Sequence, residues 1–118
     1  MHIIIKTKNL ELTPSLENLI QKRMAVSQKM INAFQESTSF LVEVEKETRH
    51  HRKGDIFKAE VIVSLPGKKL VAKAHGENLS RVITEVKNEL EREIRKYKTK
   101  TIELPRRKYR KSKRENII

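Results

Sequence analysis

The chain has 118 residues, of which 36% are hydrophobic and only 4% aromatic, so it can bury one modest core but not two. Its 27 lysine and arginine residues against 15 acidic ones give a formal net charge of +12, which favours a polyanionic partner: nucleic acid first, an anionic membrane surface second. The lack of cysteine excludes disulfides, thiolate nucleophiles and cysteine-based zinc sites. We expect a cytoplasmic protein, because the sequence shows no basic leader and no apolar run long enough for a membrane span.

A strand followed by a helix is predicted for the first third of the chain. Residues 2–8 are rich in β-branched side chains, which is typical of a strand. The helix start is marked by Thr13 as N-cap, Pro14 at the first helical position and Glu17 in the first turn. Apolar residues then recur at helical spacing, and we expect the helix to end near Ala33 or the next residue: Leu16, Leu19, Ile20, Met24, Ile31 and Phe34.

Three strands are predicted next, because apolar and polar residues alternate over 40–45, 57–65 and 70–75. A polar stretch at 48–55 separates the first two, and a Pro-Gly turn at 66–68 separates the last two. Short connections of this kind favour antiparallel hairpins. The solvent side of the sheet would carry mixed charges that do not indicate a binding surface: Glu43, Glu45, Lys58, Glu60, Ser64 and Lys73.

A second helix and a basic tail complete the chain. Gly76 ends the last strand and Asn78 is a suitable helix cap. The apolar stripe that follows comprises Leu79, Val82, Ile83, Val86, Leu90, Ile94 and Tyr97. Residues 98–118 hold 9 Lys and Arg against 2 acidic residues and lack this period, so we expect a flexible tail after a domain of residues 1–97.

The order of elements, β-α-β-β-β-α, predicts an α+β fold. A four-stranded sheet with both helices packed on one face would bury one side of the sheet and the two helical stripes in a single core. The sequence does not determine the oligomeric state, and we expect a monomer.

A stripe of long cations on the second helix is the first candidate binding surface. Its residues follow a 3-4-4-3 spacing opposite the apolar stripe, with Lys96 at the edge: Arg81, Thr84, Asn88, Arg92 and Arg95. Lys22 and Lys29 share an outward face of the first helix, so a groove between the helices would be lined by groups that reach phosphates. The alternative is an ordinary solvated face, with pairs such as Glu91–Arg95 and Glu89–Arg92 neutralising the cations locally.

A compact cationic cluster at 49–53 is the second candidate. Arg49, Arg52 and Lys53 at a hairpin end could bind phosphate, or could simply form a polar loop tip. His50 and His51 make a poor metal site, because adjacent side chains point apart and no other ligand lies at suitable spacing. With only three glycines, no phosphate-cradling loop and no nucleophile motif, the sequence predicts neither an enzyme nor a cofactor.

Three segments in register resemble a known family. Ile3–Lys6 with Leu10–Pro14, Lys46–Val61, and Leu90–Lys98 are similar to the short ribosome hibernation-promoting factors, also called ribosome-associated inhibitors. The resemblance covers roughly residues 1–100 and implies a fold like that of double-stranded-RNA-binding domains. It also implies a position in the decoding cleft of the small ribosomal subunit, where the protein binds ribosomal RNA and excludes messenger and transfer RNA.

The resemblance implies which residues meet the RNA. From the first helix they are Lys22, Arg23 and Lys29, and from the second Lys87, Arg92, Arg95, Lys96 and Lys98. Arg81 and the loop residues Arg49, Arg52 and Lys53 join them on the basis of the charge pattern. The implied partner is the ribosome, with no small-molecule substrate, metal or membrane. Two alternatives stay open: a general double-stranded-RNA-binding module, and a regulatory adaptor that binds another protein or an anionic membrane.

Overall fold

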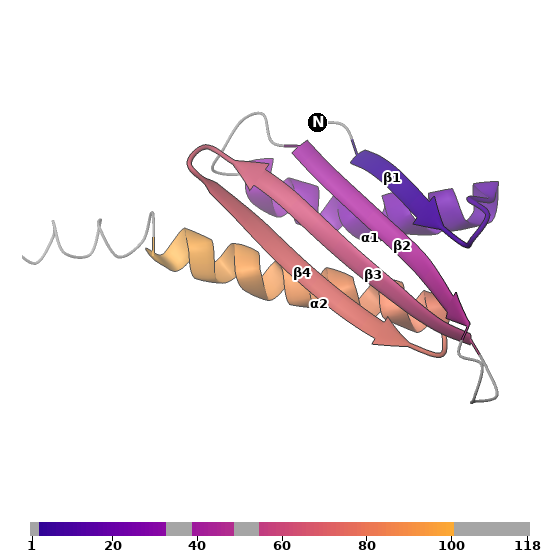
Figure 1. The fold of residues 1–118 in the computed structure, drawn as a ribbon. Coiled ribbons are helices and arrows are strands. Elements are labelled where there is room, and N and C mark those ends of the chain that lie inside the picture. Colours follow the sequence, from indigo (N-terminus) through magenta and orange to yellow (C-terminus); the bar gives the residue numbers. More distant parts are fainter. Residues whose placement is uncertain (1–2, 33–38, 49–54, 101–118) are drawn as a thin grey trace, which may run out of the picture.

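The computed structural model describes residues 3–32, 39–48 and 55–100 and has the expected element order. The elements are β1 (Ile3–Lys8), α1 (Pro14–Asn32), β2 (Ser39–Thr48), β3 (Asp55–Leu65), β4 (Lys68–Gly76) and α2 (Leu79–Lys98). The strands form one sheet, and both helices lie behind it in Figure 1, α1 behind β1 and β2, α2 along β4. The predicted β-α-β-β-β-α architecture, with two helices on one face, is therefore confirmed.

The strands are arranged in their chain order, β1-β2-β3-β4. β1 pairs with β2 in parallel, Ile3 opposite Phe40, and α1 supplies the crossover that a parallel pair needs. β2, β3 and β4 form an antiparallel meander. At its tight turn Gly67 adopts a φ of +75°, a conformation that residues with a Cβ rarely take.

The hairpin formed by β2 and β3 is longer than the alternation of apolar and polar residues in the sequence predicted. Pairing continues to Thr48 opposite Asp55, beyond the expected ends at residues 45 and 57. The added residues are mostly polar, and Lys46 contacts Asp55 at 3.2 Å. The ladder therefore continues where the core no longer demands apolar side chains.

Both predicted helix caps are present. The Thr13 hydroxyl accepts a hydrogen bond from the Leu16 N–H at 3.2 Å, and Asn78 Oδ1 accepts one from the Arg81 N–H at 3.1 Å. Each satisfies one of the N–H groups that lack a partner within the helix. α1 begins at Pro14 as expected, whereas Ala33 and Phe34, at its predicted end, lie outside the described residues.

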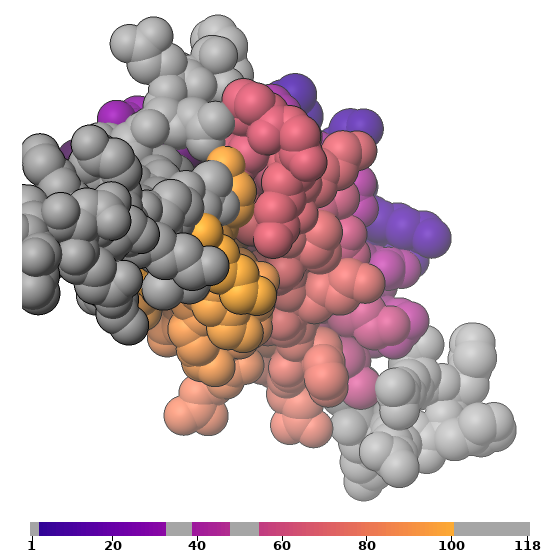
Figure 2. Space-filling view, turned by 90° about the vertical axis from the view of Figure 1, so that its left-hand side faces the viewer, coloured from indigo at the N-terminus to yellow at the C-terminus, as the bar shows by residue number. Residues whose placement is uncertain are grey.

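One core lies between the sheet and the helices. The inward strand residues meet the helical stripes, with Leu19 and Leu79 half-buried at the margin. From α1 and α2 the core takes Leu16, Ile20, Met24, Ile31, Val82, Ile83, Val86, Leu90, Ile94 and Tyr97. Figure 2 shows the C-terminal part of α2 directly beside the strands, where Lys68 lies 5.8 Å from the centre of the Tyr97 ring.

Candidate nucleic-acid interface

The outward side of α2 presents most of the cations predicted on this helix to solvent. Its buried residues form one stripe against the sheet, so the remaining surface of the helix faces outward. The exposed cations on that surface are Arg81, Arg92, Arg95, Lys96 and Lys98. Lys98 is the last residue of α2, so this helix extends one residue into the segment expected to be a tail. Residues 101–118 of that segment lie outside the described residues.

The local ion pairs expected on this helix are formed, but they are exposed. Arg92 contacts Glu89 at 3.2 Å and Lys96 contacts Glu93 at 3.5 Å, with the two cations 65% and 68% exposed. Solvent-exposed pairs of this kind contribute little free energy and are screened by salt. A phosphate can therefore compete for these cations.

Lys87 has a different environment from the other candidate residues. Its side chain is only 22% exposed and lies 3.5 Å from Glu91, which is 13% exposed and also contacts Arg95 at 3.7 Å. Val82, at one edge of the buried stripe of α2, packs beside Gly76 of β4. Lys87 and Glu91 lie at the opposite edge of that stripe, which faces the α1 side. Glu91 thus draws two of the predicted RNA-binding cations toward itself.

The cations of α1 fall into two groups. Lys22 and Lys29 are exposed, as the sequence predicted, whereas Arg23 is half-buried and its Nε has no hydrogen-bond partner among the described residues. Ser27, one turn later, is fully buried and its hydroxyl also has no partner among the described residues.

Lys and Arg outnumber acidic residues by nine to five over α1 and α2, so the two helices together form a basic layer.

The cationic cluster at 49–53 lies outside the described residues. This applies to Arg49, Arg52 and Lys53, and also to His50 and His51. Within the described part of the chain, no cluster of three His, Cys, Asp or Glu side chains could hold a metal ion. None of the described helices is both long and apolar enough to cross a membrane.

One surface feature was missed by the sequence reasoning. The open face of the sheet carries the expected charges, but also an apolar residue on every strand: Ile4, Leu41, Ile62 and Val71. The signal was present, since each of these residues occupies a solvent-side position of its strand's alternation.

Comparison with known proteins identifies the family. The family described as Sigma 54 modulation protein / S30EA ribosomal protein matches residues 3–102. The chain belongs to this family. A ribosome hibernation promoting factor from Acinetobacter guillouiae is 30% identical over 101 residues, covering 83% of this chain and 88% of the relative. The predicted resemblance to the hibernation-promoting factors is thereby confirmed.

Solved structures of other proteins share the fold. The N-terminal domain of Protein Y from Thermus thermophilus superposes with a TM-score of 0.63 at 20% identity, covering 82% of this chain and 99% of that one. A ribosomal subunit interface protein from Coxiella burnetii gives a TM-score of 0.58 at 20% identity, covering 84% and 99%. At this level of identity the two likenesses support the architecture.

Proposed function

We propose that this chain is a non-catalytic ribosome-binding protein that inhibits translation during hibernation. The single observation that carries the proposal is the family match over residues 3–102, which includes both basic helices. The names of its relatives, a ribosome hibernation promoting factor and a ribosomal subunit interface protein, support the same partner. Such a role would place the protein in the cytoplasm, acting as a monomer.

The mechanism that we propose is steric competition in the decoding cleft of the small subunit. The basic layer formed by α1 and α2 would bind phosphates of ribosomal RNA, with release of counterions as the main driving force. The folded domain would then occupy the volume that messenger and transfer RNA need. No covalent step is involved.

The RNA-binding surface would consist of the cations of α1 and α2, most of them exposed. Its members are Lys22, Arg23, Lys29, Arg81, Lys87, Arg92, Arg95, Lys96 and Lys98, with Arg49, Arg52 and Lys53 as further candidates. Recognition would follow RNA shape, because Phe40 and Tyr97 are buried and Phe57 is half-buried, so the described residues offer no exposed aromatic ring for base stacking.

Sucrose-gradient sedimentation with purified ribosomes and separated subunits tests the proposal. At near-physiological salt the protein should comigrate with the small subunit and the intact ribosome, and messenger RNA with transfer RNA should displace it. A protein that remains at the top of the gradient would contradict the ribosomal role. Equal binding to free duplex RNA and to ribosomes would instead favour a general RNA-binding module.

A further inference from the structure

An uninterrupted apolar row crosses the open face of the sheet. Ile4 is paired with Leu41 across β1 and β2, Leu41 with Ile62 across β2 and β3, and Ile62 with Val71 across β3 and β4. Ile4 is 51% and Val71 43% exposed, and the two central residues are partly exposed. With strands about 4.8 Å apart, the row is about 14 Å long. A sheet face that only contacts water has no need of such a row.

The row beside it holds two carboxylates in an unfavourable position. Glu43 and Glu60 lie directly opposite each other on β2 and β3, flanked by Lys6 and Lys73 on the edge strands. Like charges in this arrangement destabilise a sheet. Glu60 has an ion pair with Lys73 at 3.7 Å, whereas Glu43 has no ion pair with any described residue.

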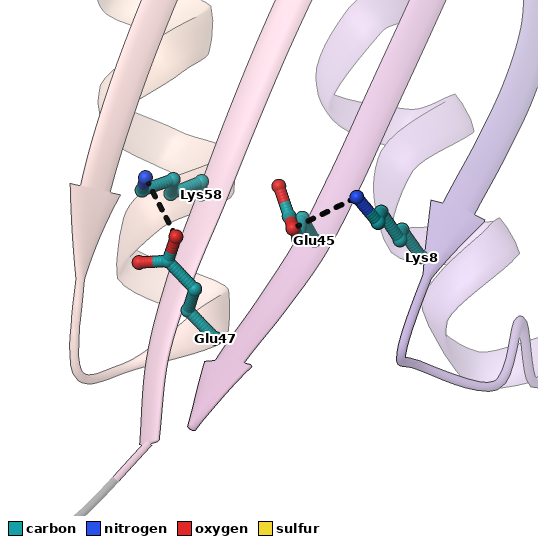
Figure 3. A network of polar contacts seen from close by, with 4 residues as sticks. All are labelled: Lys8, Glu45, Glu47 and Lys58. Atoms are coloured by element: carbon teal, nitrogen blue, oxygen red, sulfur yellow. Dashed lines mark hydrogen bonds and ion pairs between the residues drawn. The ribbon is translucent and has the colours of Figure 1, made fainter. Parts of the chain in front are cut away.

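The charges farther along the strands are paired on the same face. Figure 3 shows Glu45 with Lys8 at 3.7 Å and Glu47 with Lys58 at 3.0 Å, all four side chains pointing away from the helices. A hollow of about 700 Å³ is lined by Lys8, Glu45 and Lys58 and reaches Glu43 and Glu60. Space for a cationic side chain therefore exists beside Glu60 and beside Glu43, which has no ion pair with a described residue.

We infer that the open sheet face is a docking surface for a basic protein segment. The segment would lay apolar side chains along Ile4, Leu41, Ile62 and Val71 and place a lysine or arginine between Glu43 and Glu60. This inference rests on the proposed function for its partner, which is a basic protein component of the ribosome. The helices would then meet RNA while the sheet meets protein.

Other occupants fit this face less well. Nucleic acid is disfavoured because its phosphates would approach the Glu43–Glu60 pair. A second copy, packed about a two-fold axis parallel to the strands, would place Glu43 over Glu60 and Lys6 over Lys73. Like charges would then oppose each other throughout that row, so the face is not self-complementary.

The double substitution Glu43→Gln and Glu60→Gln tests this inference through the direction in which the affinity for ribosomes changes. Loss of one charge-assisted contact to the partner should weaken ribosome binding about tenfold, while binding to free duplex RNA is unchanged or stronger. The matched control, Glu17→Gln with Glu85→Gln, removes two charges from the helices and should not weaken ribosome binding. If both double variants bind ribosomes more tightly, the protein meets only RNA and the inference is wrong.

Site-specific photo-crosslinking identifies what touches the face. A diazirine amino acid is placed at Ile62 or, as control, at Asn88 on the outward side of α2, and each variant is irradiated on purified ribosomes after gradient isolation. At position 62 the product should keep its increased mass after ribonuclease digestion, whereas at position 88 ribonuclease digestion should remove most of the added mass. Comigration with position 62 joined only to RNA, to a second copy or to nothing would overturn this inference alone. Failure to comigrate would overturn the proposed function and this inference with it.

Discussion

Lys87 and Glu91 form an ion pair across one turn of α2, 3.5 Å apart, with side chains only 22% and 13% exposed. The second carboxylate oxygen of Glu91 lies 3.7 Å from Arg95, so a single acid holds two cations of the proposed RNA-binding surface. Neutralising this acid should release both of them.

The substitution Glu91→Gln is therefore expected to strengthen binding to duplex RNA and to ribosomes by several-fold at low salt. The loss of two helical ion pairs should lower the free energy of unfolding by about 1 kcal/mol at most. Glu85→Gln is the control, since Glu85 is exposed and has no ion pair with a described residue. Filter binding at several salt concentrations would measure the affinities, and equal effects of the two substitutions would show that Glu91 does not sequester the cations.

Replacing Arg92 and Arg95 together with alanine should weaken ribosome binding with little loss of stability. Both side chains are 65% exposed, so their removal leaves the core unchanged. If each neutralises one phosphate, the slope of log affinity against log salt should fall by about 2.

The control for this pair keeps the charge on the same side of α2, through Arg92→Lys with Arg95→Lys. Its affinity and salt slope should stay closer to wild type, and its melting temperature should match that of the alanine variant. Ribosome binding that survives the loss of both arginines would exclude this side of α2 from the interface.

Ser27→Ala should stabilise the protein by about 1 kcal/mol. The hydroxyl is fully buried without a partner among the described residues, and an unsatisfied buried polar group of this kind costs roughly 1–3 kcal/mol. Urea unfolding followed by circular dichroism gives the difference. Ser15→Ala, at an exposed position of the same helix, measures the effect of helix propensity alone, and the substitution at Ser27 should exceed it.

Asn78→Ala should lower the free energy of unfolding by about 1 kcal/mol, because it removes the capping side chain that accepts a hydrogen bond from the Arg81 N–H. Asn88→Ala is a matched change in the interior of the same helix, where alanine is the better helix former and stability should rise slightly. Equal unfolding midpoints for the two variants would argue that the cap contributes nothing.

The elements and the core could be predicted because each depends on a local pattern. Thr13, Pro14 and Asn78 act on backbone groups within one helical turn, and the apolar stripes repeat with the period of their own helix. The added length of β2 and β3 could not be predicted in this way. Their outer residues are stabilised by contacts with each other, as in the ion pair of Lys46 with Asp55, rather than by full burial.

The sequence predicted which cations belong to the candidate site, but not how exposed or paired each of them is. The sequence identifies the cations, yet Lys87 and Arg92 are given the same status by charge alone, and only the packing of α2 shows that Lys87 is sheltered while Arg92 is open. The apolar row depends on register across four strands. That register aligns residues as distant in the chain as Ile4 and Leu41, which a period-two pattern within one strand cannot reveal.

The parallel pairing of β1 also affects the order in which the sheet can form. β2, β3 and β4 join through short connections, so their ladder can grow between chain neighbours. Ile3 meets Phe40 only after the chain has passed through α1, and closing this larger loop costs more entropy. The edge strand that carries Ile4 should therefore dock last during folding. Its backbone amides should also be among the first in the sheet to exchange with solvent deuterium, before the central strands open.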